Sequence, residues 1–326
     1  MKKIIPIVIV VFIVIFFISL FSGSVKITFS DLMTLFQKDV DNDFVKTIVM
    51  DVRLPRIIMA LLTGMMLASS GTVVQTVFQN PLADPYIIGI SASATFGAVL
   101  SFVLNLPDYM YGIMAFFTSV ITSFMIFKIS RTSKKTHTST LLIVGVAVSS
   151  FLGAFTSFTM YLIGEDSFKI IMWTMGYLGG ASWSKIVMMI FPLILSIILF
   201  ILNRNELDAL LSGEEEAHAL GVNVEKLKKT MLITASLIVA FSVAFTGMIG
   251  FVGLIVPHIM RMFVGSSNSK LIPLATVFGG IFLLASDTIA RTILAPVEIP
   301  IGVITSFFGA PFFLYLALKG KRGGFH

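Results

Sequence analysis

The sequence predicts an all-α polytopic membrane protein with about ten transmembrane helices. Three observations predict this class: 56% of the 326 residues are apolar, only 12% are charged, and the apolar residues gather in long runs. Soluble domains carry about 25% charged residues, and a soluble fold this poor in charge would expose large apolar patches. Lipid is therefore the solvent that suits this chain.

The individual helices follow from the apolar runs, because a helix needs about 20 apolar residues to cross a bilayer. The run 230–264 is too long for one helix: at about 1.5 Å per residue it would reach about 52 Å, against a hydrocarbon core of about 30 Å. Gly247, Gly250, Gly253 and Pro257 are natural break points, so we expect two helices there and ten in all. The runs are 4–22, 57–78, 86–106, 109–127, 141–163, 186–203, 230–264, 271–286 and 299–318.

The first run follows Lys2 and Lys3, as in a signal peptide. It is long for a signal peptide, and Ser22-Gly23-Ser24 lacks an A-x-A cleavage pattern, so we expect a retained first helix. No soluble domain, low-complexity tract or clear repeat stands out. We therefore expect residues 1–326 to form a single transmembrane domain.

The positive charges predict the orientation of this domain. With ten helices and an inside N-terminus, 15 of the 23 Lys and Arg residues fall in inner segments and 8 in outer ones. The positive-inside rule then predicts that both termini are cytoplasmic. The inner residues are Lys2, Lys3, Lys128, Arg131, Lys134, Lys135, Arg204, Lys226, Lys228, Lys229, Arg261, Lys270, Lys319, Lys321 and Arg322.

Several kinds of chemistry are absent from the sequence. It contains no G-x-x-x-x-G-K-[ST] loop, no H-E-x-x-H motif and no Cys, and its four His residues are scattered. We expect no catalytic residue, no metal site and no cofactor in this chain. The net charge of +6 lies in short loops between apolar runs, so we expect membrane lipid rather than nucleic acid as its surroundings.

Charge inside the membrane is scarce, whereas an ion-driven carrier usually keeps acidic residues there for its coupling ion. Asp287 is the main candidate, and Arg291 follows it by four residues. Residues four apart on a helix face each other, so we expect these two to form an ion pair. Small residues such as Gly64, Ala68 and Gly71 are expected to be packing contacts between helices.

Three arginines stand at outer helix ends, against the positive-inside rule: Arg53, Arg56 and Arg291. One interpretation is snorkelling of the guanidinium groups to lipid headgroups. The other is a docking site for acidic side chains of an external partner, because arginine binds carboxylates bidentately.

Two segments are not ordinary loops. Residues 79–85, Gln-Asn-Pro-Leu-Ala-Asp-Pro, carry two prolines that forbid a continuous helix. The connection 204–229 is the longest on the predicted cytoplasmic side. Within it, Gly213 and Gly221 bracket a short helical stretch whose three acidic residues favour a helix N-terminus. This stretch is either a solvated loop helix or a lever seated in a cytoplasmic motor.

A series of motifs in order gives a specific resemblance over residues 51 to 318. The chain resembles the permease subunits of type II ABC importers for ferric siderophores, haem and cobalamin. The motifs are Arg53-Leu-Pro-Arg56, Gly64 to Gln75, Gln79 to Pro85, Trp173 to Gly176 with Gly179, Gly180 and Trp183, Leu211 to Gly221, Gly250 to His258 with Arg261, Ala285 to Arg291, Glu298 to Gly302 and Gly309 to Pro311.

The resemblance implies the type II ABC importer permease fold, with ten helices in one permease domain of a bacterial cytoplasmic membrane. It implies a homodimer or a heterodimer with a paralogous permease. It also implies two cytoplasmic ATPase subunits, which bind the ATP and Mg, and an extracytoplasmic binding protein. Arg53, Arg56 and Arg291 then occupy the positions that receive acidic residues of that binding protein.

The same resemblance implies a coupling segment, residues 212–221, that contacts the ATPase. Its residues are Ser212, Gly213, Glu214, Glu215, Glu216, Ala217, Leu220 and Gly221. For the cytoplasmic gate we expect Asn80, Pro81 and Leu82 together with Thr138 and Ser139, because both groups lie at the predicted cytoplasmic mouth.

The expected function is import of an iron complex: a ferric siderophore first, then haem, then cobalamin. The main alternative is an ion-driven secondary transporter, which would need no ATPase and no binding protein. The scarcity of acids within the apolar runs and the acidic cytoplasmic segment argue against that alternative.

Overall fold

The computed structural model describes residues 4–23, 25, 27–34, 43–132, 135–136 and 138–322, and nearly all of them are helical. The exception among regular elements is a short ribbon in which β1 (Arg131–Thr132) pairs antiparallel with β2 (Lys135–Thr136). The helices are α1 (Ile4–Phe21), α2 (Phe29–Thr34), α3 (Asp43–Thr47), η1 (Ile48–Arg53), α4 (Leu54–Val77), η2 (Pro85–Ile88), α5 (Ile90–Val103), α6 (Met110–Ile129), α7 (Thr138–Ile163), η3 (Gly164–Ser167), α8 (Phe168–Thr174), α9 (Trp183–Leu202), α10 (Arg204–Leu211), α11 (Glu214–Ala219), α12 (Val224–Thr246), α13 (Val252–Val264), α14 (Asn268–Ala290) and α15 (Ile301–Arg322).

Each predicted apolar run falls on a helix, which confirms the all-α class. Within the described residues, six helical runs are long and apolar enough to cross a membrane, and four shorter helices are also apolar. The six are Asp43–Val77, Met110–Ile129, Ser139–Ile163, Trp183–Leu202, Val224–Thr246 and Asn268–Ala290, and the four are Pro6–Phe21, Ile90–Val103, Val252–Val264 and Ile301–Tyr315.

The overlong run 230–264 breaks at Gly247 and Gly250, as two of the predicted points required, whereas Gly253 and Pro257 lie inside α13. α12 ends at Thr246 and α13 begins at Val252, with Gly247 at a φ of 67°. The start of α12 differs from the sequence estimate, since the helix begins at Val224 rather than near 230. The reason is a local cap: the Asn223 side chain accepts a hydrogen bond from the Lys226 amide at 3.1 Å.

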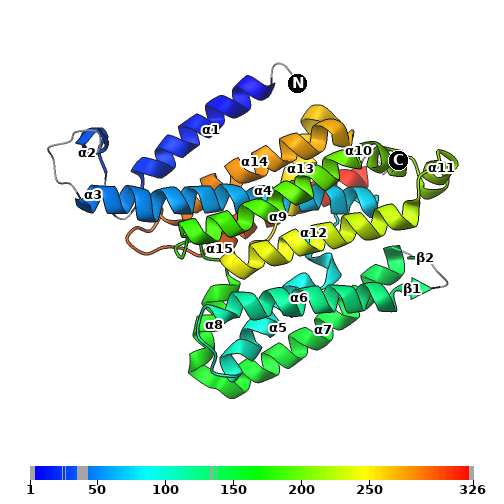
Figure 1. Cartoon of the computed structure of the whole chain (residues 1–326), viewed down its shortest axis with the longest axis horizontal. Helices are drawn as coiled ribbons and strands as arrows, with labels where there is room; N and C mark the ends of the chain where they lie inside the picture. Colours follow the sequence, from blue (N-terminus) through cyan, green and yellow to red (C-terminus); the bar gives the residue numbers. More distant parts are fainter. Residues whose placement is uncertain are drawn as a thin grey trace.

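The helices form two groups that lie one above the other in Figure 1. In the larger group α4 lies at the centre and packs against α14, α12, α13 and α9. In the smaller group α5 packs against α6 and α7, with α8 beside them. The contact of α12 with α6 joins the two groups, so α12 belongs to the boundary between them.

Glycines set the close approach of α4 to its neighbours. A Cβ built on Gly64 would lie 2.2 Å from the Gly279 carbonyl oxygen of α14, and one on Gly71 would lie 1.8 Å from the Gly253 oxygen of α13. Both positions therefore require glycine. This confirms the packing role predicted for Gly64 and Gly71. Ala68 belongs to the same contact, because its methyl group lies 2.3 Å from the position of a Cβ on Gly279.

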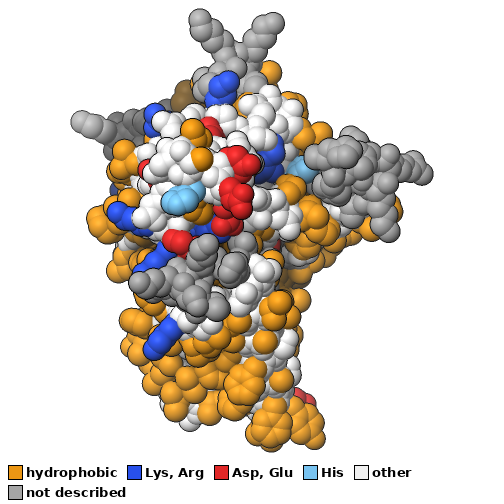
Figure 2. Space-filling view, turned by 90° about the vertical axis from the view of Figure 1, so that its right-hand side faces the viewer, with side chains coloured by type: hydrophobic (Ala, Val, Ile, Leu, Met, Phe, Trp, Pro, Cys, Tyr) orange, Lys and Arg blue, Asp and Glu red, His pale blue; other side chains and the backbone are white. Residues whose placement is uncertain are grey.

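The two ends of the molecule differ. In Figure 1, α10, α11 and the β1–β2 ribbon lie at the right-hand end with the last turns of α15, while α2 and α3 lie at the opposite end. Figure 2 looks onto the right-hand end: acidic, basic and His side chains gather there, and apolar side chains cover the flank below. A charged end with apolar sides is the distribution that a membrane-spanning protein needs.

Candidate functional site: an unwound core, a buried arginine cluster and a charged opposite end

Three helix breaks meet in the core of the molecule. The break between α12 and α13 lies beside the segment after α8, where the Tyr177 amide donates to the Thr246 carbonyl at 2.8 Å. The start of α15 joins them, because the Gly302 amide donates to the Met175 carbonyl at 3.0 Å. These bonds satisfy backbone groups that the helices leave unpaired. Irregular backbone in a membrane protein occurs where it is buried in protein or lines a cavity.

A fourth break supports the same region from the α4–α5 side. The Tyr86 hydroxyl lies 3.3 Å from the Ile249 carbonyl oxygen and 3.4 Å from the Ile249 amide. Asp84 holds this turn, because its Oδ1 accepts from the Tyr86 amide at 2.7 Å. Burial raises the pKa of the Asp84 carboxyl to about 6. Asp84 therefore sits poised between its charged and neutral forms near pH 6.

A hollow of about 540 Å³ lies against these breaks. This volume falls in the range of about 300–1,000 Å³ that small-molecule sites occupy. Its walls are largely apolar and carry no charged side chain, so the surface is suited to passage rather than to tight binding of an anion or cation. The lining residues are Thr174, Met175, Met248, Gly250, Gly302, Val303, Ser306 and Phe307.

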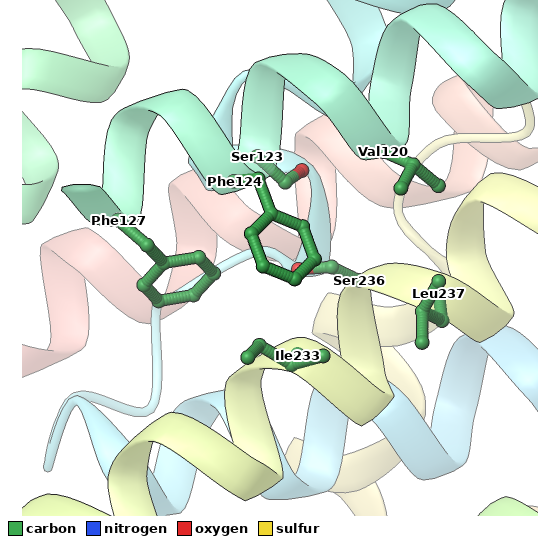
Figure 3. A pocket seen from close by; sticks show the side chains of 7 residues that line it. All are labelled: Val120, Ser123, Phe124, Phe127, Ile233, Ser236 and Leu237. Atoms are coloured by element: carbon green, nitrogen blue, oxygen red, sulfur yellow. The ribbon is translucent and has the colours of Figure 1, made fainter.

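A second hollow between α6 and α12 is far too small for a cargo. Figure 3 shows Phe124 and Phe127 of α6 facing Ile233 and Leu237 of α12 across it. Its volume is about 10 Å³, close to that of one water molecule. The buried hydroxyls of Ser123 and Ser236 lie at its wall without a hydrogen-bond partner. It is therefore a small packing void between α6 and α12 rather than a ligand site.

Arg56, in the first turn of α4, is the centre of a buried ion cluster. Its Nη2 lies 2.9 Å from Asp287 Oδ1, and its Nη1 lies 2.9 Å from Glu298 Oε1. Asp287 has no exposed side-chain surface. The predicted Asp287–Arg291 pair is also present, at 3.4 Å. Asp287 thus joins two guanidinium groups and links α4 to the end of α14.

Arg53 and Arg291 bind the C-terminal end of α1. Arg53 donates to the carbonyl oxygens of Leu20 and Val25, and Arg291 donates to those of Ser19 and Ser22. Cations at a helix C-terminus are stabilising because the carbonyl groups there are unpaired. Arg53, Arg56 and Arg291 are all buried in the chain, with acceptors of its own. Docking of external carboxylates on these arginines stays a prediction. It requires the guanidinium groups to give up hydrogen bonds within this chain in exchange for bonds to the partner.

The coupling segment forms the short helix that its bracketing glycines predicted. α11 spans Glu214–Ala219, with Gly213 before it and Gly221 after it at a φ of 85°. Glu215 and Glu216 are exposed, as are Ser212, Leu220 and Gly221, whereas Ala217 is fully buried and anchors the helix. Glu214 forms an ion pair with Lys228 of α12, whose side chain is almost entirely buried.

The predicted gate residues lie at the same end as the coupling segment. After α4, the Gln79 side chain donates to the Leu210 carbonyl of α10 at 2.6 Å, which places the break at 80–82 beside α10. Asn80 is exposed, Pro81 and Leu82 are half-buried, and Asn80 Oδ1 accepts from the Leu82 amide at 2.9 Å. Ser139 is exposed at the start of α7, and the Thr138 side chain lies outside the described residues.

Sequence reasoning did not name the residues that line the larger hollow, Met175, Met248, Val303 and Phe307 among them. The available signal was the glycine break inside an overlong apolar run, since unwound backbone at membrane depth lines cavities. Among the described residues, no group of three or more His, Cys, Asp or Glu side chains is placed to hold a metal ion.

The apolar flanks, the unwound core and the charged end define a polytopic membrane permease. Residues 11–319 match the model of the FecCD transport family, and the chain belongs to that family of ABC importer permeases. It is 42% identical over 274 residues to the cobalamin import system permease BtuC of Halobacterium salinarum, covering 83% of this chain and 73% of that protein. It is 38% identical over 288 residues to the hemin transport permease HmuU of Yersinia pestis, covering 86% of each.

A solved structure shares the fold. It is of a protein assigned to the metal-chelate type of ABC transporter, in an inward-facing conformation. The two chains superpose with a TM-score of 0.87 at 30% identity, over 98% of this chain and 100% of the other.

Proposed function

We propose that this permease carries an iron complex or a corrinoid through the hollow beside the unwound core, driven by separate ATPase subunits. The observation that carries the proposal is the hollow itself, lined by non-helical backbone of the α12–α13 break. The hollow has the volume of a small-molecule site and no charged wall. A bulky cargo with an apolar surface is able to move along this uncharged lining without being held in a deep energy minimum.

The charged end is the cytoplasmic end in this proposal. The predicted inner segments, including α10, α11 and the β1–β2 ribbon, gather there, and the positive-inside rule assigns them to the cytoplasm. Ten crossings follow if the four shorter apolar helices span the membrane together with the six long ones. Both termini are then cytoplasmic.

The partners follow from this orientation. Two ATPase subunits, which bind ATP and Mg, seat against the coupling segment. An extracytoplasmic binding protein delivers cargo at the opposite end, near Arg53, Arg56 and Arg291. A second permease, identical or paralogous, completes the pathway.

Among cargoes, a ferric siderophore comes first, then haem, then cobalamin. Relatives named for cobalamin, hemin and iron chelatin all resemble this chain at 34% identity or more. These names support a class of large chelates and do not separate its members.

The test is uptake of labelled ferric siderophores, haem and cobalamin in parallel, with the gene deleted and then restored. We expect loss of one cargo, recovery with the gene, and abolition by ATP depletion but not by collapse of ion gradients. A valine-to-tryptophan change at Val303, which fills the hollow, should lower uptake without lowering the amount of protein in the membrane. Uptake that follows an ion gradient would favour the secondary-transporter alternative and overturn the proposal.

A further inference from the structure

The N-terminus of α14 is capped by a residue of another helix. Asp208 Oδ1 accepts from the Asn268 amide at 2.6 Å and from the Asn268 side chain at 2.9 Å, and Asp208 Oδ2 accepts from the Ser267 hydroxyl at 2.9 Å. Ser267 is the N-cap residue of α14, yet its own side chain caps no backbone amide. The negative charge that favours this helix end therefore comes from α10.

This contact ties α10 to two helices at once. Asn268 is fully buried, and its Oδ1 accepts from the Thr76 hydroxyl of α4 at 3.1 Å. Leu207 and Leu210 of α10 are fully buried, and the Leu210 carbonyl accepts from Gln79. α10 is thus held to the C-terminal end of α4 and the N-terminal end of α14 by four hydrogen bonds and by apolar burial.

The coupling segment follows α10 directly. α11 packs against α10 and α12, whereas α10 packs against α4 and α14. α4 and α14 in turn behave as one unit, since Gly64 and Gly279 bring their backbones together and Asp287 binds Arg56 at the far end. A displacement of α11 would therefore reach the α4–α14 pair through α10, and Asp208 makes the hydrogen bonds between α10 and α14.

We propose that Asp208 is a positioning residue that couples the cytoplasmic segment to α14, so that movement of α11 is delivered to the α4–α14 pair. The inference rests on the proposed function, in which ATPase subunits move the coupling segment. Asp208 touches neither cargo nor nucleotide in this account. It acts through Ser267 and Asn268.

The test uses the complete complex of permease, ATPase subunits and binding protein in lipid vesicles. We expect Asp208→Ala to assemble normally and to hydrolyse ATP, but to take up about tenfold less cargo per ATP, within the 5–150-fold span of typical coupling between sites. Glu206→Gln is the matched control, because Glu206 is an exposed acid on the same helix. It should transport as the wild type does.

A conservative variant separates this contact from a general need for an acid. In Asp208→Asn the side-chain oxygen still accepts from the Asn268 amide and side chain, and the new NH2 group donates to the Ser267 hydroxyl. We expect Asp208→Asn to retain at least half of the uptake per ATP that Asp208→Ala loses.

A distance between α10 and α14 tests the Asp208 contact without measuring transport. The sequence has no Cys, so Asn205→Cys on α10 and Ser269→Cys on α14 provide unique sites for spin labels at exposed positions. We expect one narrow distance within the subunit in the parent protein and in Glu206→Gln, and a broad distribution in Asp208→Ala.

Either of two results would overturn the inference: unchanged uptake per ATP in assembled Asp208→Ala, or an unchanged label distance. Failure of the proposed function is recognised separately, because the wild-type complex would then show no ATP-dependent uptake. The label distances would still decide whether Asp208 fixes α10 to α14.

Discussion

Asp287 is the carboxylate that joins the two buried arginines Arg56 and Arg291. It is fully buried and lies between the guanidinium groups of Arg56 and Arg291. In Asp287→Asn the Arg291 guanidinium loses the carboxylate it pairs with, and Arg56 keeps only the partly exposed Glu298. Removing one partner of a buried ion pair costs about 3–5 kcal/mol, so we expect a much smaller amount of folded protein and a lower thermal midpoint.

Glu298→Gln is the control for that prediction. Glu298 also binds Arg56, but its side chain is 31% exposed. Water already screens this pair, so we expect a loss of about 1 kcal/mol or less. Both variants are compared by tryptophan fluorescence on heating the purified protein, using Trp173 and Trp183. Equal losses in the two variants would contradict the central role of Asp287.

The carboxyl group of Asp84 predicts that the stability of the protein depends on pH. Burial raises its pKa from 3.8 to about 6, so the folded protein holds the proton more tightly than the unfolded chain does. The free energy of unfolding should then be highest below pH 4, fall by roughly 1–3 kcal/mol as the pH rises to about 6, and stay level above.

Asp84→Asn keeps an oxygen for the Tyr86 amide and removes the charge, so the thermal midpoint of this variant should lose that dependence. Asp108→Asn, at an exposed loop position, should retain the wild-type profile. A profile in Asp84→Asn that matches the wild type would refute the assignment to this carboxyl.

Single residues were predictable only where the partner is near in sequence. The Asp287–Arg291 pair follows from helical spacing, whereas the Arg56–Asp287 pair joins residues 231 positions apart and has no signature in the sequence. The same applies to Asp208 and Asn268, which lie on different helices. The outer arginines were recognised as unusual, but their burial was not.

Among the elements, the crossing of α4 with α14 depends on having no side chain at Gly64. In Gly64→Ala the added Cβ meets the Gly279 carbonyl oxygen at 2.2 Å, a distance that forces the helices apart. We expect a loss of about 1–3 kcal/mol, as for other overpacked contacts. Gly153→Ala in α7 is the control, because its Cβ meets no atom within 4 Å and alanine favours the helix. Equal thermal midpoints for the two variants would show that the crossing tolerates a methyl group.

The long helices were predictable because each needs only an apolar run of sufficient length. The break at 247–251 was predictable for the same reason, since one helix of that length does not fit the bilayer. The short helices α8 and α10 were not predicted, because helices of this length are stable only through tertiary contacts. Buried Leu207 and Leu210 supply such contacts for α10.

For the whole molecule, the proposed transport by alternating access would require the two helix groups to move relative to each other. The small hollow between α6 and α12 in Figure 3 lies at the boundary of the two groups, whereas Gly112 and Ala244 approach closely elsewhere along the same two helices. The boundary between the two groups therefore combines a close backbone contact with one small void, and relative movement of the groups would have to repack it.

Leu82 tests whether the break after α4 narrows the inner end of the pathway. Leu82 is half-buried beside the segment that contacts α10, so an indole there adds bulk to the predicted gate while leaving the α4–α14 crossing untouched. We expect Leu82→Trp to reach the membrane in wild-type amounts and to lower cargo uptake about tenfold or more, as obstruction of a conformational step does. Leu104→Trp, at an exposed position after α5, adds the same bulk near the opposite end and should transport normally. Normal uptake in Leu82→Trp would remove residues 80–82 from the gate, whereas equal loss in both variants would mean that added bulk harms the protein wherever it is placed.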